Sequence, residues 1–250
     1  MEETVPIEPA STLVLIRDSK QGPQVLMQQR SHHAVFVGGA WVFPGGKLDA
    51  DDSLEDWQPL IPALSETTAH AILHLENASS PCNIDQIHPH EAAHTANVSA
   101  LAYWVAVLRE AYEEAGLLLT EQPVAQTQRD LWRAALLADK LSWLQLIKDN
   151  NLSLAINGIH YLSRWVTPPG NPRRYDTRFF IGVAPADQTP SHENHEAIQT
   201  QWITPEEALA AHARSEKVLI FPTIVTLQAM CGHDCCDALI ADVLNHFHRT

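Results

Sequence analysis

The sequence predicts an α/β protein in which a mixed sheet lies between two layers of helices, an α/β/α sandwich. Strand-like patterns fill the N-terminal region and recur near residues 159–203, whereas helical periodicity fills the middle and the C-terminal end. The chain has 250 residues, 45% of them hydrophobic, which is enough to bury a full core. We expect one domain over 1–250, with a helical insertion at about 53–100 and C-terminal helices at about 205–250.

The predicted elements follow one another in a simple order. Short apolar or alternating segments between turn residues predict strands at 12–17, 24–30, 41–43, 117–119, 159–167, 177–184 and 199–203. Helical spacing of apolar residues predicts helices at 64–77, 97–115, 128–138, 142–149, 205–213, 222–230 and 236–248. Thr204 is the expected N-cap of the helix that begins at Pro205. Strands and helices in this order favour a mixed sheet with helices on both faces.

The helix predicted at 97–115 ends in a concentration of negative charge. Glu110, Glu113 and Glu114 stand at positions i, i+3 and i+4, so a helix places them on one face. At about 100° per residue this face lies roughly 160° from the apolar stripe, and Gly116 suits the left-handed residue that ends a helix. Such a face is either an ordinary solvated surface or a site for a divalent cation, which takes oxygen ligands and pairs with substrate phosphates.

A second segment favours the cation site over the solvated surface. It is Trp41-Val42-Phe43-Pro44-Gly45-Gly46-Lys47-Leu48-Asp49. It predicts a short strand broken by a Pro-Gly-Gly turn, and glycine lets a backbone approach a ligand closely. Together the two segments resemble the Nudix hydrolases, whose signature is Gly, five residues, Glu, seven residues, then Arg-Glu-apolar-x-Glu-Glu-x-Gly-apolar. Gly46 fits the first glycine, residues 109–117 fit the second half, and Asp52 stands where the first glutamate belongs.

The spacing between the two halves departs from this signature. Between Asp52 and Arg109 there are 56 residues instead of seven, so 49 are inserted. One branch of the family carries a long insertion within its motif and is typified by the mammalian peroxisomal coenzyme A diphosphatase. Further segments resemble that branch: 28–31, 48–52, 164–168, 174–180 and 202–208. The resemblance covers most of residues 10–230 and implies the Nudix α/β/α sandwich.

The resemblance also assigns roles to the residues of the two segments. It implies that Glu110, Glu113 and Glu114 hold Mg²⁺ or Mn²⁺, with the backbone carbonyl of Gly45 as a further ligand. Arg109 is then expected to orient the carboxylates through charge-assisted hydrogen bonds. The family implies that the general base is a glutamate of the signature or an acid from a later loop.

The candidates for a base outside the signature are Glu193 and Glu196, which precede the last predicted strand. Asp52 carries one methylene fewer than the glutamate that the family has at its position. We therefore expect Asp52 to reach less far toward its partner than a glutamate does.

The net charge of −14 disfavours nucleic acid as a partner, because phosphate backbones require stripes of Lys and Arg. An acidic protein that binds an anionic substrate needs a metal or a local basic patch. The densest cationic cluster is Arg173, Arg174 and Arg178. We expect Arg30, Arg174 and Arg178 to bind a small nucleotide-type substrate.

The resemblance implies a metal-dependent hydrolase that cleaves a diphosphate linkage. Coenzyme A or acyl-CoA, cut to phosphopantetheine and 3′,5′-ADP, is the first expectation. ADP-ribose or another nucleoside diphosphate derivative is the alternative, and a damaged nucleoside triphosphate is a weaker one. A non-catalytic ligand sensor on the same fold is a remote alternative, because such regulators usually lose signature glutamates that this chain keeps.

Other features give weaker signals. Cys231, Cys235 and Cys236 with His233 invite a zinc interpretation, but they lack paired spacing, which favours ordinary thiols. Three histidines at 88, 90 and 94 lie near Glu91 in the insertion, where a polar helix start is favoured over a metal site. No apolar run reaches membrane-spanning length, and neither terminus resembles a signal peptide or a peroxisomal Ser-Lys-Leu, so we expect a cytoplasmic protein without a membrane partner. A homodimer is possible.

Overall fold

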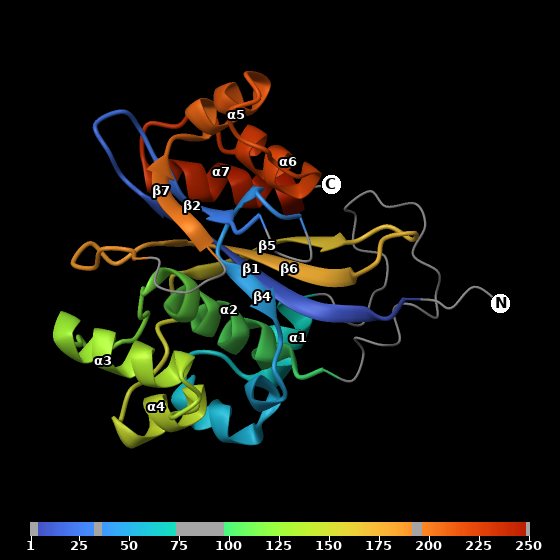
Figure 1. Cartoon of the computed structure of the whole chain (residues 1–250). Helices are drawn as coiled ribbons and strands as arrows, with labels where there is room; N and C mark the ends of the chain where they lie inside the picture. Colours follow the sequence, from blue (N-terminus) through green and yellow to red (C-terminus); the bar gives the residue numbers. More distant parts are fainter. Residues whose placement is uncertain (1–4, 33–36, 74–97, 192–196, 249–250) are drawn as a thin grey trace.

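The computed structural model describes residues 5–32, 37–73, 98–191 and 197–248. A seven-stranded sheet crosses the molecule, with helices above and below it in the view of Figure 1. The strands are β1 (Ile7–Arg17), β2 (Gln24–Arg30), β3 (Trp41–Val42), β4 (Gly45–Lys47), β5 (Ile159–Val166), β6 (Arg174–Val183) and β7 (Ala197–Ile203). The predicted strands at 12–17, 24–30, 41–43, 159–167, 177–184 and 199–203 are confirmed, several of them with longer bounds.

The sheet is mixed, as predicted. Strand β1 runs parallel to β6 on one side and antiparallel to both β2 and β4 on the other. The path β3-β2-β1-β6-β5 is completed by β7, which pairs with β2. The predicted turn at 44–46 is wrong in part, because Gly45–Lys47 forms a strand that pairs with residues 10–12 of β1. A side chain at Gly45 would strike the Ser11 carbonyl oxygen at 2.4 Å, so only glycine permits this close pairing.

The helices form one layer on each face of the sheet. They are α1 (Glu66–Ile72), α2 (Ala100–Ala115), α3 (Gln126–Leu137), α4 (Trp143–Asp149), α5 (Pro205–Ala213), α6 (Phe221–Ala229) and α7 (Cys236–His248). Helices α5 to α7 cover one face and α1 to α4 the other (Figure 1). The predicted sandwich is therefore confirmed. Thr204 caps α5 by accepting a hydrogen bond from the Glu207 backbone N–H, also as predicted.

Strand β1 separates two hydrophobic cores. Leu13 and Leu15 pack toward α2, whereas Val14 and Ile16 pack toward α5, α6 and α7. All four are fully buried. This alternation is what a strand covered on both faces requires, since successive side chains point to opposite sides of a sheet.

Helix α2 is buried on nearly all sides, not only along its predicted apolar stripe. Ala102, Tyr103 and Ala106, on the glutamate side, are fully buried, and Ser11 of β1 donates a hydrogen bond to the Tyr103 carbonyl. The sheet therefore covers the glutamate face of α2, which the sequence predicted to lie opposite the apolar stripe. The helix ends at Gly116 with φ of 70°, as predicted.

The described part of the insertion caps the start of α2. It contains two 3₁₀ helices, Ala50–Ser53 and Glu55–Leu60, followed by α1. The carboxylate of Glu66 in α1 accepts hydrogen bonds from Ser99 Oγ and from the backbone N–H groups of Ala100 and Leu101. Negative charge at a helix N-terminus is stabilising, so the insertion contributes directly to the stability of α2.

The strand predicted at 117–119 is wrong. Leu117, Leu118 and Leu119 are buried but do not join the sheet. The side-chain amide of Gln188 accepts from the Leu118 N–H and donates to the Leu118 carbonyl, so it replaces a neighbouring strand. A buried backbone must find such partners, and a residue 70 positions away supplies them here.

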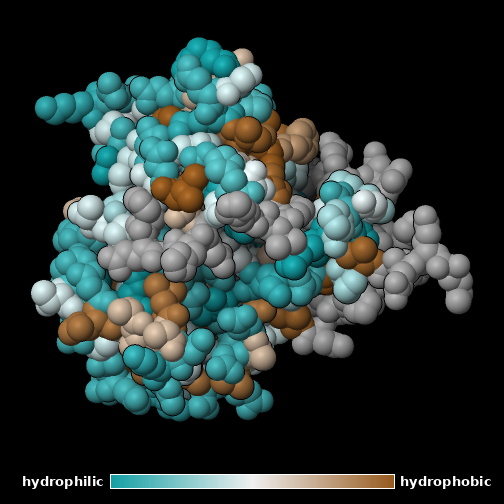
Figure 2. Space-filling view, viewed as in Figure 1, coloured by the Kyte–Doolittle hydropathy of each residue, from teal (hydrophilic) through white to brown (hydrophobic). Residues whose placement is uncertain are grey.

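Among the described residues, no helix is both long and apolar enough to cross a membrane. The face of the molecule in Figure 2 is largely hydrophilic, with separate hydrophobic patches on it.

Candidate active site

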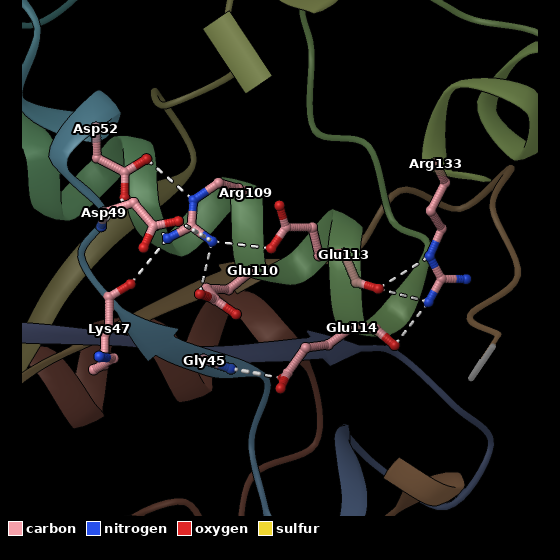
Figure 3. Close-up of polar contacts among 9 residues, drawn as sticks. All are labelled: Gly45, Lys47, Asp49, Asp52, Arg109, Glu110, Glu113, Glu114 and Arg133. Atoms are coloured by element: carbon pink, nitrogen blue, oxygen red, sulfur yellow. Dashed lines mark hydrogen bonds and ion pairs between the residues drawn. The ribbon is translucent and has the colours of Figure 1, made fainter. Parts of the chain in front are cut away.

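The two halves of the split motif meet where the last turns of α2 approach β4 (Figure 3). The Gly45 N–H donates to Glu114 Oε2 at 3.0 Å. A Cβ at Gly46 would lie 2.4 Å from Glu110 Oε1. Glycine at position 46 therefore allows the β4 backbone to approach the Glu110 carboxylate more closely than any other residue would.

Arg109 donates hydrogen bonds to three carboxylates, those of Asp52, Glu110 and Glu113. Its Nη1 donates to Glu110 Oε1 and Glu113 Oε2, both at 2.9 Å. Its Nε and Nη2 donate to the two oxygens of Asp52 at 3.1 and 2.9 Å, and Nη2 also donates to the Lys47 carbonyl. Despite its shorter side chain, Asp52 makes this contact with both oxygens. A guanidinium has the planar fork that such a shared, bidentate arrangement needs.

The site holds more negative charge than its arginine balances. Burial raises the pKa of Glu110 well above its usual range, and repulsion from Glu114 and Glu113 adds to the rise against the attraction of Arg109. Burial likewise raises the pKa of Glu113 and of Asp52, again opposed by Arg109. Burial alone would lower the pKa of Arg109, but its carboxylate partners raise it overall. One buried guanidinium thus faces several carboxylates, an arrangement that a further cation would relieve.

The glutamate set fits a hard divalent cation in its chemistry, since its donors are all carboxylate oxygens. Across 5–32, 37–73, 98–191 and 197–248, no three His, Cys, Asp or Glu side chains already converge on a common point. The reason is visible in Figure 3: Arg109 draws Glu110 and Glu113 to one side, while Glu114 points to the Gly45 N–H. A cation would therefore be held after these flexible carboxylates turn toward it.

The glutamates line a large cavity. It has a volume of about 990 Å³, and Glu110, Glu113, Glu114 and Arg109 lie in its wall beside β4. Other parts of the wall come from β1, from β5 and β6 with the segment between them, and from the start of α6. This volume accommodates a nucleotide-sized ligand.

The sequence singled out four arginines, which lie in different parts of the fold. Arg30 and Arg173 line the cavity, and the Nε of Arg30 is buried without a hydrogen-bond partner among the described residues. Arg174 and Arg178 are not brought to the cavity. They alternate along β6 with the lining residues Tyr175, Thr177 and Phe179, so they point to the opposite side of the sheet, the side that α2 covers. Arg178 is buried there beside Asp176 and over the Tyr103 ring.

Arg133 is a site residue that the sequence analysis missed. From α3 it donates to the carbonyls of Glu113 and Glu114 (Figure 3). It also donates to the side chain and the carbonyl of Ser191. No spacing in the sequence connects α3 to the signature, so only the fold reveals this contact. The aromatic residues of the cavity wall could likewise not be predicted from the sequence, because strand pairing brings them together.

Several predicted residues cannot be placed. Glu193 and Glu196 lie outside the described residues, as do the histidines and the glutamate at 88–94. Cys231, Cys235 and Cys236 are free thiols, and the Cys231 thiol donates to the Leu227 carbonyl. Within the described ranges these cysteines form no group that could hold a metal ion.

Known proteins share both the sequence and the fold. The NUDT19 Nudix domain model matches residues 8–230. The chain is 30% identical over 225 residues to acyl-coenzyme A diphosphatase NUDT19 from Homo sapiens, covering 78% of this chain and 57% of the relative. It is 27% identical over 234 residues to the protein of the same name from Gallus gallus, covering 84% and 61%. The chain thus spans about 57–61% of the length of these curated relatives.

A solved structure agrees at the level of the fold. The crystal structure of a NUDIX hydrolase from Alicyclobacillus acidocaldarius has a TM-score of 0.60 and 24% sequence identity, covering 91% of this chain and 92% of that chain. The carboxylate face beside β4, the mixed sheet between helices and the family model over residues 8–230 agree with one another. The chain belongs to the Nudix hydrolase family, in the branch defined by the NUDT19 Nudix domain.

Proposed function

We propose that the protein is a metal-dependent hydrolase that cleaves the diphosphate linkage of coenzyme A or acyl-CoA to phosphopantetheine and 3′,5′-ADP. The family match over residues 8–230 supports the reaction class. The names of the curated relatives, acyl-coenzyme A diphosphatases, support the substrate. ADP-ribose or another nucleoside diphosphate derivative is the second candidate.

The observation that carries the proposal is the set of Glu110, Glu113 and Glu114 in the wall of a cavity of about 990 Å³, where Arg109 binds the first two and the Gly45 N–H binds the third. A bound Mg²⁺ or Mn²⁺ supplies Lewis acidity toward the diphosphate and lowers the pKa of a bound water. The three glutamates, with the Gly45 backbone carbonyl as a further ligand, would hold this cation, and the Gly45 N–H holds Glu114 beside β4 before the cation binds. Arg109 donates hydrogen bonds to Glu110 and Glu113 and so holds both carboxylates beside β4, from where they would turn toward the cation.

Arg30 is proposed to bind an anionic group of the substrate. Its Nε is buried in the cavity wall without a partner among the described residues, and burying an unpaired donor is unfavourable unless a ligand completes it. Arg173 is a second cation in the same wall. The general base, from the signature or from Glu193 and Glu196, stays a prediction, as do the choice between Mg²⁺ and Mn²⁺, a homodimer and a cytoplasmic location.

The substrate is tested by incubating the purified protein with Mg²⁺ or Mn²⁺ and coenzyme A, octanoyl-CoA, ADP-ribose, NADH or dNTPs. We expect 3′,5′-ADP from the first two, resolved by chromatography, and no product with EDTA in place of the metal. Cleavage of ADP-ribose alone would select the second candidate.

The metal-ligand role is tested with Glu113→Gln, which removes a charge while keeping the shape of the side chain. We expect turnover to fall by about 100-fold or more, equivalent to about 3 kcal/mol of transition-state stabilisation. Glu121→Gln is the matched control, because Glu121 is exposed and does not line this cavity. Equal rates for Glu113→Gln and the parent would contradict the assignment, and no turnover by the parent on any substrate would favour a ligand sensor.

A further inference from the structure

The cavity has an aromatic wall that the diphosphate chemistry does not use. Phe43, Phe179, Trp165 and Phe221 all line it, and each ring contacts the next. The three successive centroid distances are 6.4, 6.4 and 5.8 Å, with interplanar angles of 89°, 64° and 85°. We call these four residues the aromatic row. Edge-to-face contacts at such distances are favourable, so the row is a preformed surface.

The aromatic row leads from the glutamates to solvent. Phe43 lies two residues before Gly45, whose N–H binds Glu114, and it is 3% exposed. Trp165 is half-buried, and Phe221, the first residue of α6, is 68% exposed at the far end. A large, exposed aromatic ring at the rim of a cavity is unfavourable in water and is typical of a ligand contact.

The chemistry of the aromatic row selects its ligand. Its four side chains carry a single polar hydrogen, the Trp165 Nε1–H, and this is already donated to Ser163 Oγ at 2.9 Å. The row therefore offers a nucleobase no hydrogen bonds, and its successive rings, being steeply angled, do not form a parallel pair between which a purine would be sandwiched. A flexible hydrocarbon chain needs neither, because it gains affinity from burial alone.

We propose that the aromatic row binds the thioester-linked acyl chain of the substrate, with the diphosphate at the glutamates. This inference rests on the proposed function, since it assumes that the cleaved diphosphate belongs to an acyl-CoA. Phe221 then determines specificity for acylated over free coenzyme A. The nucleotide half lies elsewhere in the cavity, where Arg30 and Arg173 supply positive charge.

A binding experiment separates this proposal from the question of catalysis. The probes are S-octanoyl-4′-phosphopantetheine and 4′-phosphopantetheine, which have no diphosphate and so are not consumed. Titration calorimetry of the full chain with Mg²⁺ is expected to show about tenfold tighter binding of the octanoyl probe, because burial of about two methylene groups suffices for that factor. In Phe221→Ala we expect this preference to disappear, and in Phe221→Leu to survive in part.

Leu131→Ala is the matched control, because Leu131 is 66% exposed on α3 and does not line the cavity. It should retain the full preference. Equal affinity of the parent for both probes, or an unchanged preference in Phe221→Ala, would overturn the proposal. The proposal would also be overturned if Phe221→Ala weakened the binding of 3′,5′-ADP but not that of the octanoyl probe. That result would assign the row to the nucleobase. None of these results depends on turnover, whereas failure to cleave any CoA substrate would overturn only the proposed function.

Discussion

Gly45 and Gly46 are neighbours in β4, yet each leaves room for a different kind of atom. A Cβ at Gly45 would meet the backbone of β1, with the Ser11 carbonyl oxygen at 2.4 Å and the Thr12 Cα at 2.7 Å. The atoms nearest to a Cβ at Gly46 would be the carboxylate atoms of Glu110, with Oε1 at 2.4 Å. Backbone atoms inside a sheet cannot move without breaking strand pairs, whereas a side-chain carboxylate can rotate. The first glycine thus serves the fold and the second serves the site.

This difference predicts opposite outcomes for two adjacent substitutions. Gly45→Ala should lower the free energy of unfolding by about 2 kcal/mol, because overpacking forces β4 away from β1. Gly46→Ala should change the unfolding free energy by less than about 1 kcal/mol, but lower turnover by about 10-fold or more as Glu110 rotates away. Urea denaturation and a steady-state CoA assay on both variants measure the two effects. The same loss of stability in both would contradict the distinction.

At the scale of elements, α2 places three glutamates at the end of a helix where negative charge is unfavourable. Helix C-termini carry partial negative charge and leave carbonyls without partners, and α2 has no basic residue in its last turn. Arg133 from α3 supplies what is missing by donating to the carbonyls of Glu113 and Glu114. It is 3% exposed, so its hydrogen bonds form in a largely dry environment. The geometry of the glutamates therefore depends on a helix outside the signature.

We predict that Arg133→Ala lowers the free energy of unfolding by about 2–3 kcal/mol, as expected for lost hydrogen bonds from a buried charged donor. Arg133→Lys should recover part of this, since an ammonium keeps the charge but not the planar fork. Urea denaturation gives both values, and hydrogen exchange at residues 112–116 should increase in Arg133→Ala. Arg214→Ala is the control, because Arg214 is exposed and should give no measurable change. Unaltered exchange at 112–116 would show that Arg133 does not hold this turn.

The sequence predicted those elements whose determinants are local. The spacing of Glu110, Glu113 and Glu114 with Gly116 predicted the shared face of the glutamates on α2 and the end of this helix, because helix geometry converts spacing directly into position. Residues 117–119 were mistaken for a strand because their partner is the distant Gln188 amide. The face of β6 to which Arg174 points depends on strand pairing, which sequence periodicity did not specify.

At the scale of the whole molecule, two cores on opposite faces of one sheet hold the walls of the cavity in place. The wall that carries the glutamates belongs to the α2 side, whereas Phe221 belongs to α6 on the other side. The buried glutamates of this wall destabilise the fold, because like charges lie close together away from water, as the raised pKa values of Glu110 and Glu113 indicate. A cation at the glutamates should therefore stabilise the entire fold.

We predict that Mg²⁺ at about 100 times its dissociation constant stabilises the folded state by about 2.7 kcal/mol, and so raises Tm by several degrees. The melting temperature is measured in EDTA, in MgCl₂ and in NaCl of equal ionic strength, since salt alone screens surface charges. Glu113→Gln should reduce the effect of Mg²⁺ without affecting that of NaCl. An equal rise of Tm in the two salts would show that the effect is not specific binding.

Asp52 and Arg109 flank the inserted segment in the sequence, and their contact brings its two ends together. Glu66 of the insertion also binds the first residues of α2. The insertion is therefore attached to α2 both at the start of the helix and, through Asp52, at Arg109. Closing a longer flexible loop costs only about 0.6 kcal/mol for each doubling of its length. A change in the length of the chain between Glu66 and Ala100 is therefore expected to have little effect on the glutamates, so new substrate preferences can arise in this segment while the chemistry of the site is preserved.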